Sequence, residues 1–177
     1  MDNMNQQLIL MSEAGKPIGF ASREECHRGA GRLHWGYILL LHYPDGKFLL
    51  TRRADTKKCG AGLWDASVVS HVLSGETLFE AIERRAREEV SISISKFTNL
   101  GAFVYTASYG EYSENEYCSV VVGSTDQVPD PNPEEISEIR FLNFVQLQDA
   151  IKAYPKTFAP WLTIPVKQFE KELKNSA

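Results

Sequence analysis

The chain has 177 residues, enough for one domain with a sizeable core, and its 43% hydrophobic and 24% charged residues are ordinary for a globular protein. The formal net charge is −4 and no basic run is present, which argues against a nucleic-acid partner. Three scattered cysteines exclude a disulfide framework, and neither a signal-peptide pattern nor a membrane-length apolar stretch is present. We therefore expect one domain over residues 1–177, in the cytoplasm, away from membranes, as a monomer or weak dimer.

The N-terminal part is predicted to contain a strand and one helical turn. Residues 8–11 form a short apolar run before a turn at 13–17, which indicates a first strand followed by a hairpin turn. Residues 22–26 predict a brief helical turn, because Ser22 is a favoured N-cap.

The next segments predict a hairpin. Residues 35–41 and 47–53 are rich in aromatic and aliphatic side chains, and a Tyr-Pro-Asp-Gly turn at 43–46 separates them. We therefore expect these two strands to pair with each other. A loop of mixed charge should follow over 54–63, and then a further strand over 64–72.

An amphipathic helix is predicted after this strand. Its apolar stripe, at 3.6 residues per turn, consists of Leu78, Ile82 and Ala86. Arg85 and Glu89 fall on or beside the same stripe. A charge on the face that meets the core must be paired or coordinated to be tolerated. The same spacing also fits an ordinary Arg–Glu pair at the edge of a solvated face.

The C-terminal half predicts a second hairpin, a last strand and two helices. The segments with these patterns are 100–108 and 116–123 for the hairpin, 139–144 for the strand, and 145–153 and 160–173 for the helices. A tyrosine-rich loop at 109–113 should join the hairpin strands. Together the elements predict an α+β domain of mixed strands with helices on both faces.

Histidines and carboxylates are the residues with which this chain could hold a metal. The four histidines are His27, His34, His42 and His71. Glu114 and Glu116 are two apart at the start of a predicted strand, so they point to the same face. Imidazoles and carboxylates suit zinc or manganese. Scattered histidines are more often surface or satisfied core residues, so the spacing alone does not assign a site.

The amphipathic helix and the loop before it resemble a degenerate Nudix box. The chain keeps five of the defining residues: Glu76, Arg84, Glu88, Glu89 and Ile92. Ser70 and Ser91 stand where the pattern has glycines, and Arg85 replaces its first glutamate. This Arg-Arg variant with a preceding Ser-His pair is similar to the type I isopentenyl-diphosphate isomerase branch of the family. The resemblance implies a Nudix-like mixed β-sheet sandwich flanked by helices.

Members of that branch hold a metal ion with three histidines and two glutamates. They present these as two histidines seven positions apart, a Ser-His or Gly-His pair, and Glu-Asn-Glu in a later strand. The matching residues here are His27, His34, His71, Glu114 and Glu116. The resemblance therefore implies one Mn²⁺ or Zn²⁺ in this site, whereas His42 has no counterpart.

The densest basic cluster, TRRADTKK, closes a predicted strand at residues 51–58. By itself it is either an anion-binding group or a solvated turn, and the solvated alternative is favoured for Arg52 and Lys58. The resemblance implies that Arg53 and Lys57 contact a small-molecule diphosphate.

Three further residues are implied by the family at the diphosphate. Arg23 and Arg85 should contact it, and Glu89 should help to hold a Mg²⁺ ion that bridges to it. Arg85 and Glu89, the charged pair on the apolar stripe of the predicted helix, would then act together at the diphosphate.

The reaction of the family moves a double bond, which requires two acid/base groups on opposite faces of a small apolar substrate. Glu116, supported by Tyr105, is implied as one of them. Trp161 fits the tryptophan whose ring covers the cationic centre, although a packing role in the core explains it equally well. The second group is normally a cysteine two residues before the histidine of the Ser-His pair, and Val69 stands there.

Valine cannot exchange a proton, so three functions follow in order of preference. The first is an isomerase-like enzyme acting on an isoprenoid or related diphosphate, with altered or reduced proton transfer. The second is a Mg²⁺-dependent Nudix hydrolase, favoured by Glu88 beside Glu89 and opposed by Arg85 in place of a carboxylate ligand. The third is a non-catalytic diphosphate-binding protein. Cys59, on a predicted loop, is expected to reach the substrate only after rearrangement.

Overall fold

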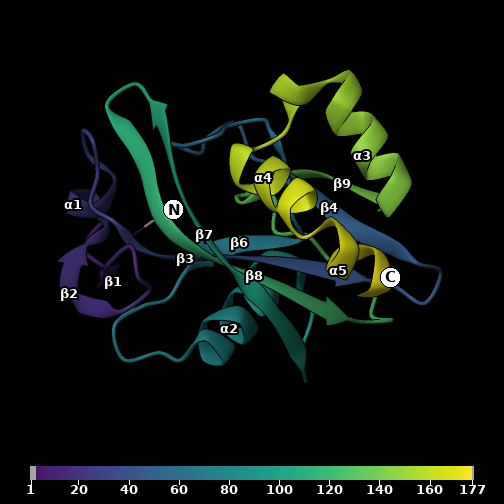
Figure 1. Cartoon of the computed structure of the whole chain (residues 1–177), viewed down its shortest axis with the longest axis horizontal. Helices are drawn as coiled ribbons and strands as arrows, with labels where there is room; N and C mark the ends of the chain where they lie inside the picture. Colours follow the sequence, from purple (N-terminus) through teal and green to yellow (C-terminus); the bar gives the residue numbers. More distant parts are fainter. Residues whose placement is uncertain (1–2, 177) are drawn as a thin grey trace.

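The computed structural model describes residues 3–176 of the chain. The strands of its sheet (Figure 1) are β1 (Gln7–Met11), β2 (Pro17–Ser22), β3 (His34–His42), β4 (Lys47–Arg53), β5 (Trp64–Asp65), β6 (Val68–His71), β7 (Phe97–Tyr109), β8 (Tyr112–Ser124) and β9 (Ile136–Asn143). The helices are α1 (Arg23–His27), α2 (Leu78–Val90), α3 (Phe144–Ala153), α4 (Pro160–Gln168) and α5 (Glu170–Ser176), with a 3₁₀ turn η1 (Pro155–Thr157).

Strand β3 is the centre of the sheet. It pairs in parallel with β8 and antiparallel with β6, and all but two of its residues are buried. A near-continuous apolar run is what a strand covered on both faces needs, because each successive side chain enters a different core. The two cores are distinct: Ile38 and Leu40 belong to one apolar cluster, and Leu39 and Leu41 to the other.

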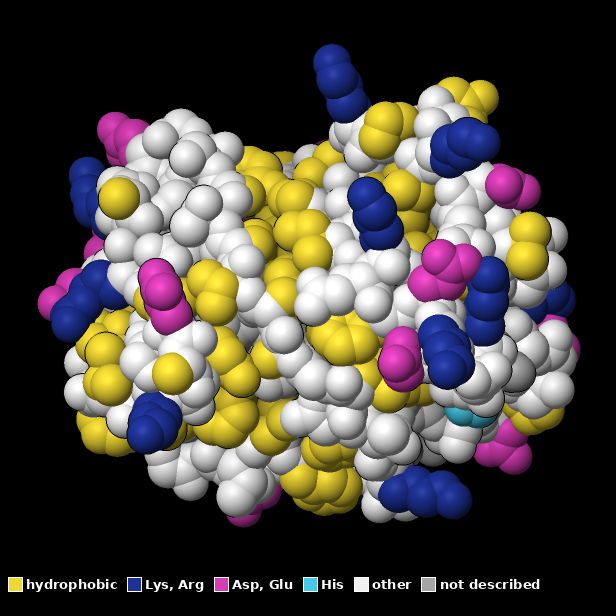
Figure 2. Space-filling model, viewed as in Figure 1, with side chains coloured by type: hydrophobic (Ala, Val, Ile, Leu, Met, Phe, Trp, Pro, Cys, Tyr) yellow, Lys and Arg dark blue, Asp and Glu magenta, His cyan; other side chains and the backbone are white. Residues whose placement is uncertain are grey.

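Helices cover both faces of the sheet, as the sequence predicts for this α+β fold. Figure 1 shows α2 against one face and α3, α4 and α5 against the other. Ile82 and Ala86 of α2 share a cluster with Leu39, and Trp161 and Leu162 of α4 share the other cluster with Leu40. In the same view, Figure 2 shows hydrophobic side chains running down the middle of the molecular surface.

The predicted hairpin between the second and third strands is wrong except at its turn. β3 and β4 meet only where His42 faces Phe48, and β4 pairs along its length with β9. The turn sequence brings the two strands into contact, but β3 pairs elsewhere with β8, about which the local pattern carries no information.

The predicted strand over 64–72 is two short strands. Ser67 separates β5 from β6, and its hydroxyl accepts from Leu41 N–H at 2.8 Å and donates to the Leu49 carbonyl at 2.6 Å. These bonds join β3 and β4 where they diverge. As a result β5 pairs with β4, whereas β6 pairs with β3.

The predicted C-terminal helix is also divided. Phe169 ends α4 with φ −109° and ψ 30°, and α5 begins at the next residue. The Phe169 ring packs against the apolar cluster beneath these helices, which favours a turn of the chain at this position. Among residues 3–176, no helix combines the length and the apolar character needed to cross a membrane.

The other predicted elements are confirmed with shifted ends. Ser22 caps α1 in a capping box with Glu25. The second hairpin is longer than predicted, because β7 and β8 remain paired as far as Tyr109 and Tyr112. Helix α2 begins at a capping box of Thr77 and Glu80 and ends at Ser91, whose φ of 58° is left-handed. Glycine is the less strained residue in that conformation, which explains the glycine of the family pattern.

Candidate active site

A cavity lies where β6 and β8 meet α1, the loop after β4, helix α2 and helix α4. Its lining includes all the predicted site residues except His34, which is fully buried. The remaining lining residues are Met4, Thr51, Lys58, Cys59, Asp65, Val69, Ser70, Tyr112, Glu135 and Ile136. The fold thus brings together side chains from both halves of the chain.

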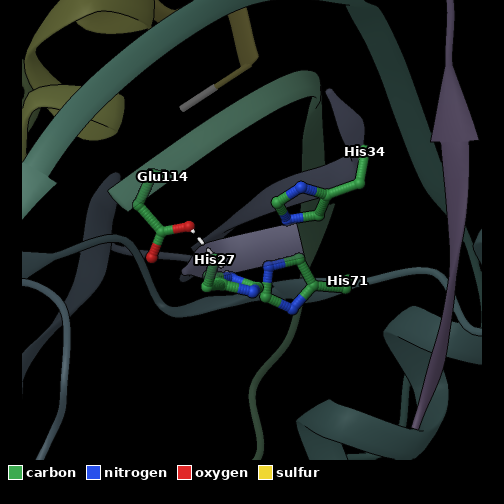
Figure 3. A group of neighbouring side chains, drawn as sticks. All are labelled: His27, His34, His71 and Glu114. Atoms are coloured by element: carbon green, nitrogen blue, oxygen red, sulfur yellow. Dashed lines mark ion pairs between the residues drawn. The ribbon is translucent and has the colours of Figure 1, made fainter. Parts of the chain in front are cut away.

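Four side chains of this site form a compact group, which we call the imidazole cluster: His27, His34, His71 and Glu114. They come from α1, the start of β3, the end of β6 and β8. One ligand atom from each lies within 4.8 Å of the others, and Figure 3 shows the four side chains converging on one point. The ring centroids of the three imidazoles are 4.7–4.9 Å apart.

Backbone carbonyls fix the tautomers of two rings. His27 Nδ1 lies 2.8 Å from the Arg23 carbonyl, and His34 Nδ1 lies 2.7 Å from the Arg32 carbonyl. A carbonyl only accepts, so both Nδ1 atoms carry the hydrogen and donate it. In a neutral ring, Nε2 is then left with a lone pair directed toward the cluster, as in metal-ligating histidines.

The imidazole cluster fits a divalent transition metal. Two of its buried ring nitrogens, His34 Nε2 and His71 Nδ1, have no hydrogen-bond partner among the described residues. The other close contacts, at 3.2 Å between His27 Nε2 and Glu114 Oε2 and at 2.9 Å between His71 Nε2 and Glu116 Oε1, join imidazole to carboxylate. Unpartnered buried polar atoms are costly and rare unless a ligand takes them. Three imidazoles and a carboxylate are the donor set that zinc and manganese accept.

The protonation states agree with this fit. Burial, reinforced by nearby positive charge, lowers the pKa of His71 well below its ordinary value, and burial lowers the pKa of His34 to about 4. Burial acts to raise the pKa of Glu114, but the adjacent His27 outweighs it and the pKa is lowered. Near neutral pH, His34 and His71 are therefore neutral and Glu114 is ionised, which are the forms that ligate metals.

Glu116 lies beside the imidazole cluster and contacts Tyr105. The Tyr105 hydroxyl donates to Glu116 Oε2 at 2.7 Å, and Glu116 Oε1 lies 2.9 Å from His71 Nε2 and 3.7 Å from His34 Nε2. Burial, and then the charge of Glu114, raises the pKa of the Glu116 carboxyl well above its ordinary range. A carboxyl with a raised pKa keeps its proton at a higher pH than an ordinary glutamate does, and this is a property of acid/base groups in enzymes.

Gly36, which our sequence analysis missed, makes room for this carboxyl. A Cβ added at Gly36 would lie 2.6 Å from Glu116 Oε1, a distance that real Cβ atoms essentially never show. A glycine inside an otherwise apolar strand was the available signal, because it indicates that another group approaches the backbone closely.

Asp65, also missed, connects two predicted residues. Its carboxylate accepts from Trp161 Nε1 at 2.9 Å and from Arg53 Nη1 at 2.9 Å. The Arg53 guanidinium also lies 5.1 Å from the centre of the Trp161 ring. Trp161 is thus both buried core and cavity wall, so the two roles predicted for it are compatible.

A second group of charged residues lies at the end of the cavity near α2. We call it the ion-pair cluster, and its members are Lys57, Arg85, Glu88, Glu89 and Glu135. Arg85 pairs with Glu88 at 2.8 Å, with Glu89, and with Glu135 at 3.3 Å, while Lys57 pairs with Glu135. Burial raises the pKa of Glu89 to about 7, although Arg85 opposes the shift. Glu135 was missed because its partners come from distant segments.

Glu76 and Arg84, two of the five box residues that the chain keeps, contact each other. Arg84 donates from Nε to Glu76 Oε1 at 2.6 Å and from Nη2 to Glu76 Oε2 at 2.9 Å. Glu76 also accepts from the Leu73 N–H at 3.1 Å. This bidentate pair fixes the loop that precedes α2.

The remaining predicted residues lie at or near the cavity wall. Arg23 lines the cavity and donates to the Gln6 side chain at 3.3 Å. Val69 lines it two residues before His71. The expectation for Cys59 is wrong: its loop folds inward, and its buried side chain lines the cavity without any rearrangement.

Comparisons with known proteins agree with this fold. The model of the NUDIX domain matches residues 32–162. An isopentenyl-diphosphate Delta-isomerase of Brevibacterium linens is 34% identical, covering 89% of this chain and 87% of the relative. Its counterpart in Salmonella typhi is 32% identical, covering 96% of each chain.

Solved structures with the same fold were also found. A protein of Deinococcus radiodurans superimposes with a TM-score of 0.68 at 25% identity, covering 84% of this chain and 90% of that one. A MutT protein of Methanosarcina mazei superimposes with a TM-score of 0.65 at 22% identity, covering 80% of this chain and 96% of that one. The latter similarity concerns the fold alone.

Proposed function

Because the chain belongs to the Nudix family, in the branch of the isopentenyl-diphosphate isomerases, we propose that it is an isomerase-like enzyme acting on an isoprenoid or related diphosphate. The observation that carries this proposal is the convergence of three imidazoles and two carboxylates at one end of a cavity whose other end holds arginine and lysine. We treat residues 1–177 as one such catalytic domain.

The residues that would hold the resident metal, Mn²⁺ or Zn²⁺, are His27, His34, His71, Glu114 and Glu116. When bound, the ion supplies a positive charge that stabilises the ionised carboxyls. The Nδ1 bonds of His27 and His34 to backbone carbonyls hold their rings in the ligating orientation.

Glu116 is the proposed acid/base group. Its carboxyl lines the cavity, where it can exchange a proton with a substrate carbon. Tyr105, which donates to Glu116 Oε2, keeps the carboxyl oriented. The ring of Trp161, fixed by Asp65, offers an electron-rich face to a positive charge that develops on the substrate.

Arg23, Arg53, Lys57 and Arg85 are the proposed contacts of the diphosphate, and Glu89 is the proposed protein ligand of a Mg²⁺ ion that accompanies it. All five line the cavity. The apolar part of the substrate would then extend toward Val69 and Trp161.

Val69 limits the second half of the reaction. Isomerisation adds one proton and removes another, and a valine two residues before His71 cannot do either. We therefore propose altered or reduced proton transfer compared with the relatives, or a related diphosphate as the true substrate.

A Nudix hydrolase is the second candidate. Glu88 and Glu89 are adjacent at the end of α2, and two neighbouring carboxylates suit a Mg²⁺ ion at the diphosphate. Both pair with Arg85 in this structure. Against it, Arg85 stands where the box has a further carboxylate. A non-catalytic diphosphate-binding protein is the third.

One assay separates the three functions. The protein and its Val69→Cys variant are incubated with isopentenyl diphosphate and Mg²⁺ in D₂O, and deuterium uptake and free phosphate are followed together by NMR. The proposal predicts deuterium uptake that rises by roughly 10²-fold or more in the variant, the usual gain from an acid/base group. Phosphate release without deuterium uptake would favour the hydrolase, and binding without either product would favour the third function.

A further inference from the structure

The carboxylate of Glu135 lies between two of the cations that we assign to the diphosphate. It pairs with Lys57 Nζ and lies 3.3 Å from Arg85 Nη2. Its side chain is 11% exposed and lines the cavity. A diphosphate oxygen that reached Lys57 and Arg85 would have to take the place of this carboxylate, because it needs the same donors.

Backbone hydrogen bonds fix Glu135 at this position. The Ala54 N–H donates to the Glu135 carbonyl at 2.9 Å, which ties Glu135 to the loop that carries Lys57. The Glu135 N–H donates to the Asn132 carbonyl at 3.0 Å, and the Asn132 N–H donates to the Glu89 carbonyl at 2.8 Å. Backbone hydrogen bonds among three segments that are distant in sequence therefore keep the Glu135 carboxylate next to Lys57 and Arg85.

Both cations of the ion-pair cluster are already paired with carboxylates. Glu135 pairs with Lys57 and Arg85, and Arg85 also pairs with Glu88 and Glu89. Adding a free diphosphate would place several like charges side by side, which is unfavourable in a site that is partly removed from water. A divalent cation would reverse this effect, because its two positive charges would be held by the carboxylates of the cluster and would offset those of the diphosphate.

We propose that Glu135 makes diphosphate binding depend on a divalent cation. Because its carboxylate is paired with Lys57 and Arg85, free diphosphate binds weakly, whereas the complex of diphosphate with the cation binds tightly. Glu135 is therefore a specificity-determining residue that discriminates between the two forms of the ligand. This inference rests on the proposed function, since it assumes that the diphosphate binds at the ion-pair cluster.

The test is calorimetric titration of inorganic diphosphate into the full chain, once with excess EDTA and once with excess Mg²⁺. Three proteins are compared: wild type, Glu135→Gln, and the control Glu138→Gln, which removes an exposed carboxylate of β9. Thermal unfolding verifies that each variant is folded. The wild type should bind the Mg²⁺ complex far more tightly than free diphosphate.

Glu135→Gln should strengthen binding of free diphosphate by roughly tenfold to a hundredfold, because a carboxylate that opposed the ligand is removed. The ratio of the two affinities should fall accordingly, and it should stay at the wild-type value in the control. An unchanged ratio in Glu135→Gln, or a wild type that binds free diphosphate as tightly as the Mg²⁺ complex, overturns the inference and leaves the proposed function intact. A wild type that binds neither form overturns both.

Discussion

The two clusters of the cavity are built in opposite ways. In the imidazole cluster, His34 Nε2 and His71 Nδ1 have no hydrogen-bond partner among residues 3–176. In the ion-pair cluster, Lys57 and Arg85 are already bound to carboxylates. The first arrangement is costly until an ion binds, whereas the second must exchange one partner for another. The comparison teaches that the two ends of the site differ in how they are prepared for a ligand. The metal end has ring nitrogens without a partner in the part of the chain that the structure describes, whereas at the diphosphate end a carboxylate must first leave the cations.

The largest effect should come from Glu116→Gln, made in the Val69→Cys background. The amide keeps a hydrogen bond with Tyr105 but cannot exchange a proton, so the isomerisation rate should fall by roughly 10²–10⁴-fold. Deuterium uptake by isopentenyl diphosphate measures it. Tyr105→Phe, which leaves the carboxyl in place, is the control and should cost less. A loss of only a few-fold in Glu116→Gln would remove Glu116 from the chemistry.

Gly36→Ala should disturb the imidazole cluster and leave the ion-pair cluster unchanged. The added methyl group occupies the space of the Glu116 carboxyl, which must move away from His71. We expect the affinity for Zn²⁺ or Mn²⁺ to fall by roughly 10–100-fold, as when groups that orient ligands are removed. Gly46→Ala is the control: its φ of 74° strains a turn outside the cavity lining, so it accounts for a general loss of stability, while a Cβ there meets no atom within 4 Å. Equal metal affinities in the two variants would contradict the role of Gly36.

The Glu89→Gln variant tests the ion-pair cluster through the pH dependence of the free energy of unfolding. Burial raises the pKa of Glu89 from 4.5 in the unfolded chain to about 7, so the folded protein keeps this proton after the unfolded chain has lost it. The contribution of this proton to the free energy of unfolding is fully present below about pH 4.5 and is lost as the pH rises to about 7. Glutamine does not titrate. Without Mg²⁺, the free energy of unfolding of the variant relative to wild type should therefore rise by about 1–3 kcal/mol between pH 5 and pH 8. A constant difference in urea unfolding would contradict this.

The sequence predicts the members of the imidazole cluster because each lies in a short motif. His27 and His34 flank one basic segment, His71 follows a serine, and Glu114 and Glu116 alternate on one strand. The structure brings all of them together. The same local signals predicted the cap of α1 and most of the helices and strands.

Pairings between distant segments could not be predicted in this way. Asp65 and Glu135 gain their roles from Trp161, Lys57 and Arg85, which are remote in sequence. The hairpin error has the same origin, since β3 takes β8 as its parallel neighbour from the other half of the chain. The inward fold of the loop that carries Cys59 is likewise a tertiary effect.

The most direct test of the account is calorimetric titration of Zn²⁺ or Mn²⁺ into protein stripped of metal with a chelator. The five converging side chains predict one ion per chain at the imidazole cluster, and the double variant His27→Ala, His71→Ala should bind none. Wild type that fails to bind a stoichiometric ion, or a double variant that binds it with unchanged affinity, would contradict the metal centre on which the proposed function depends.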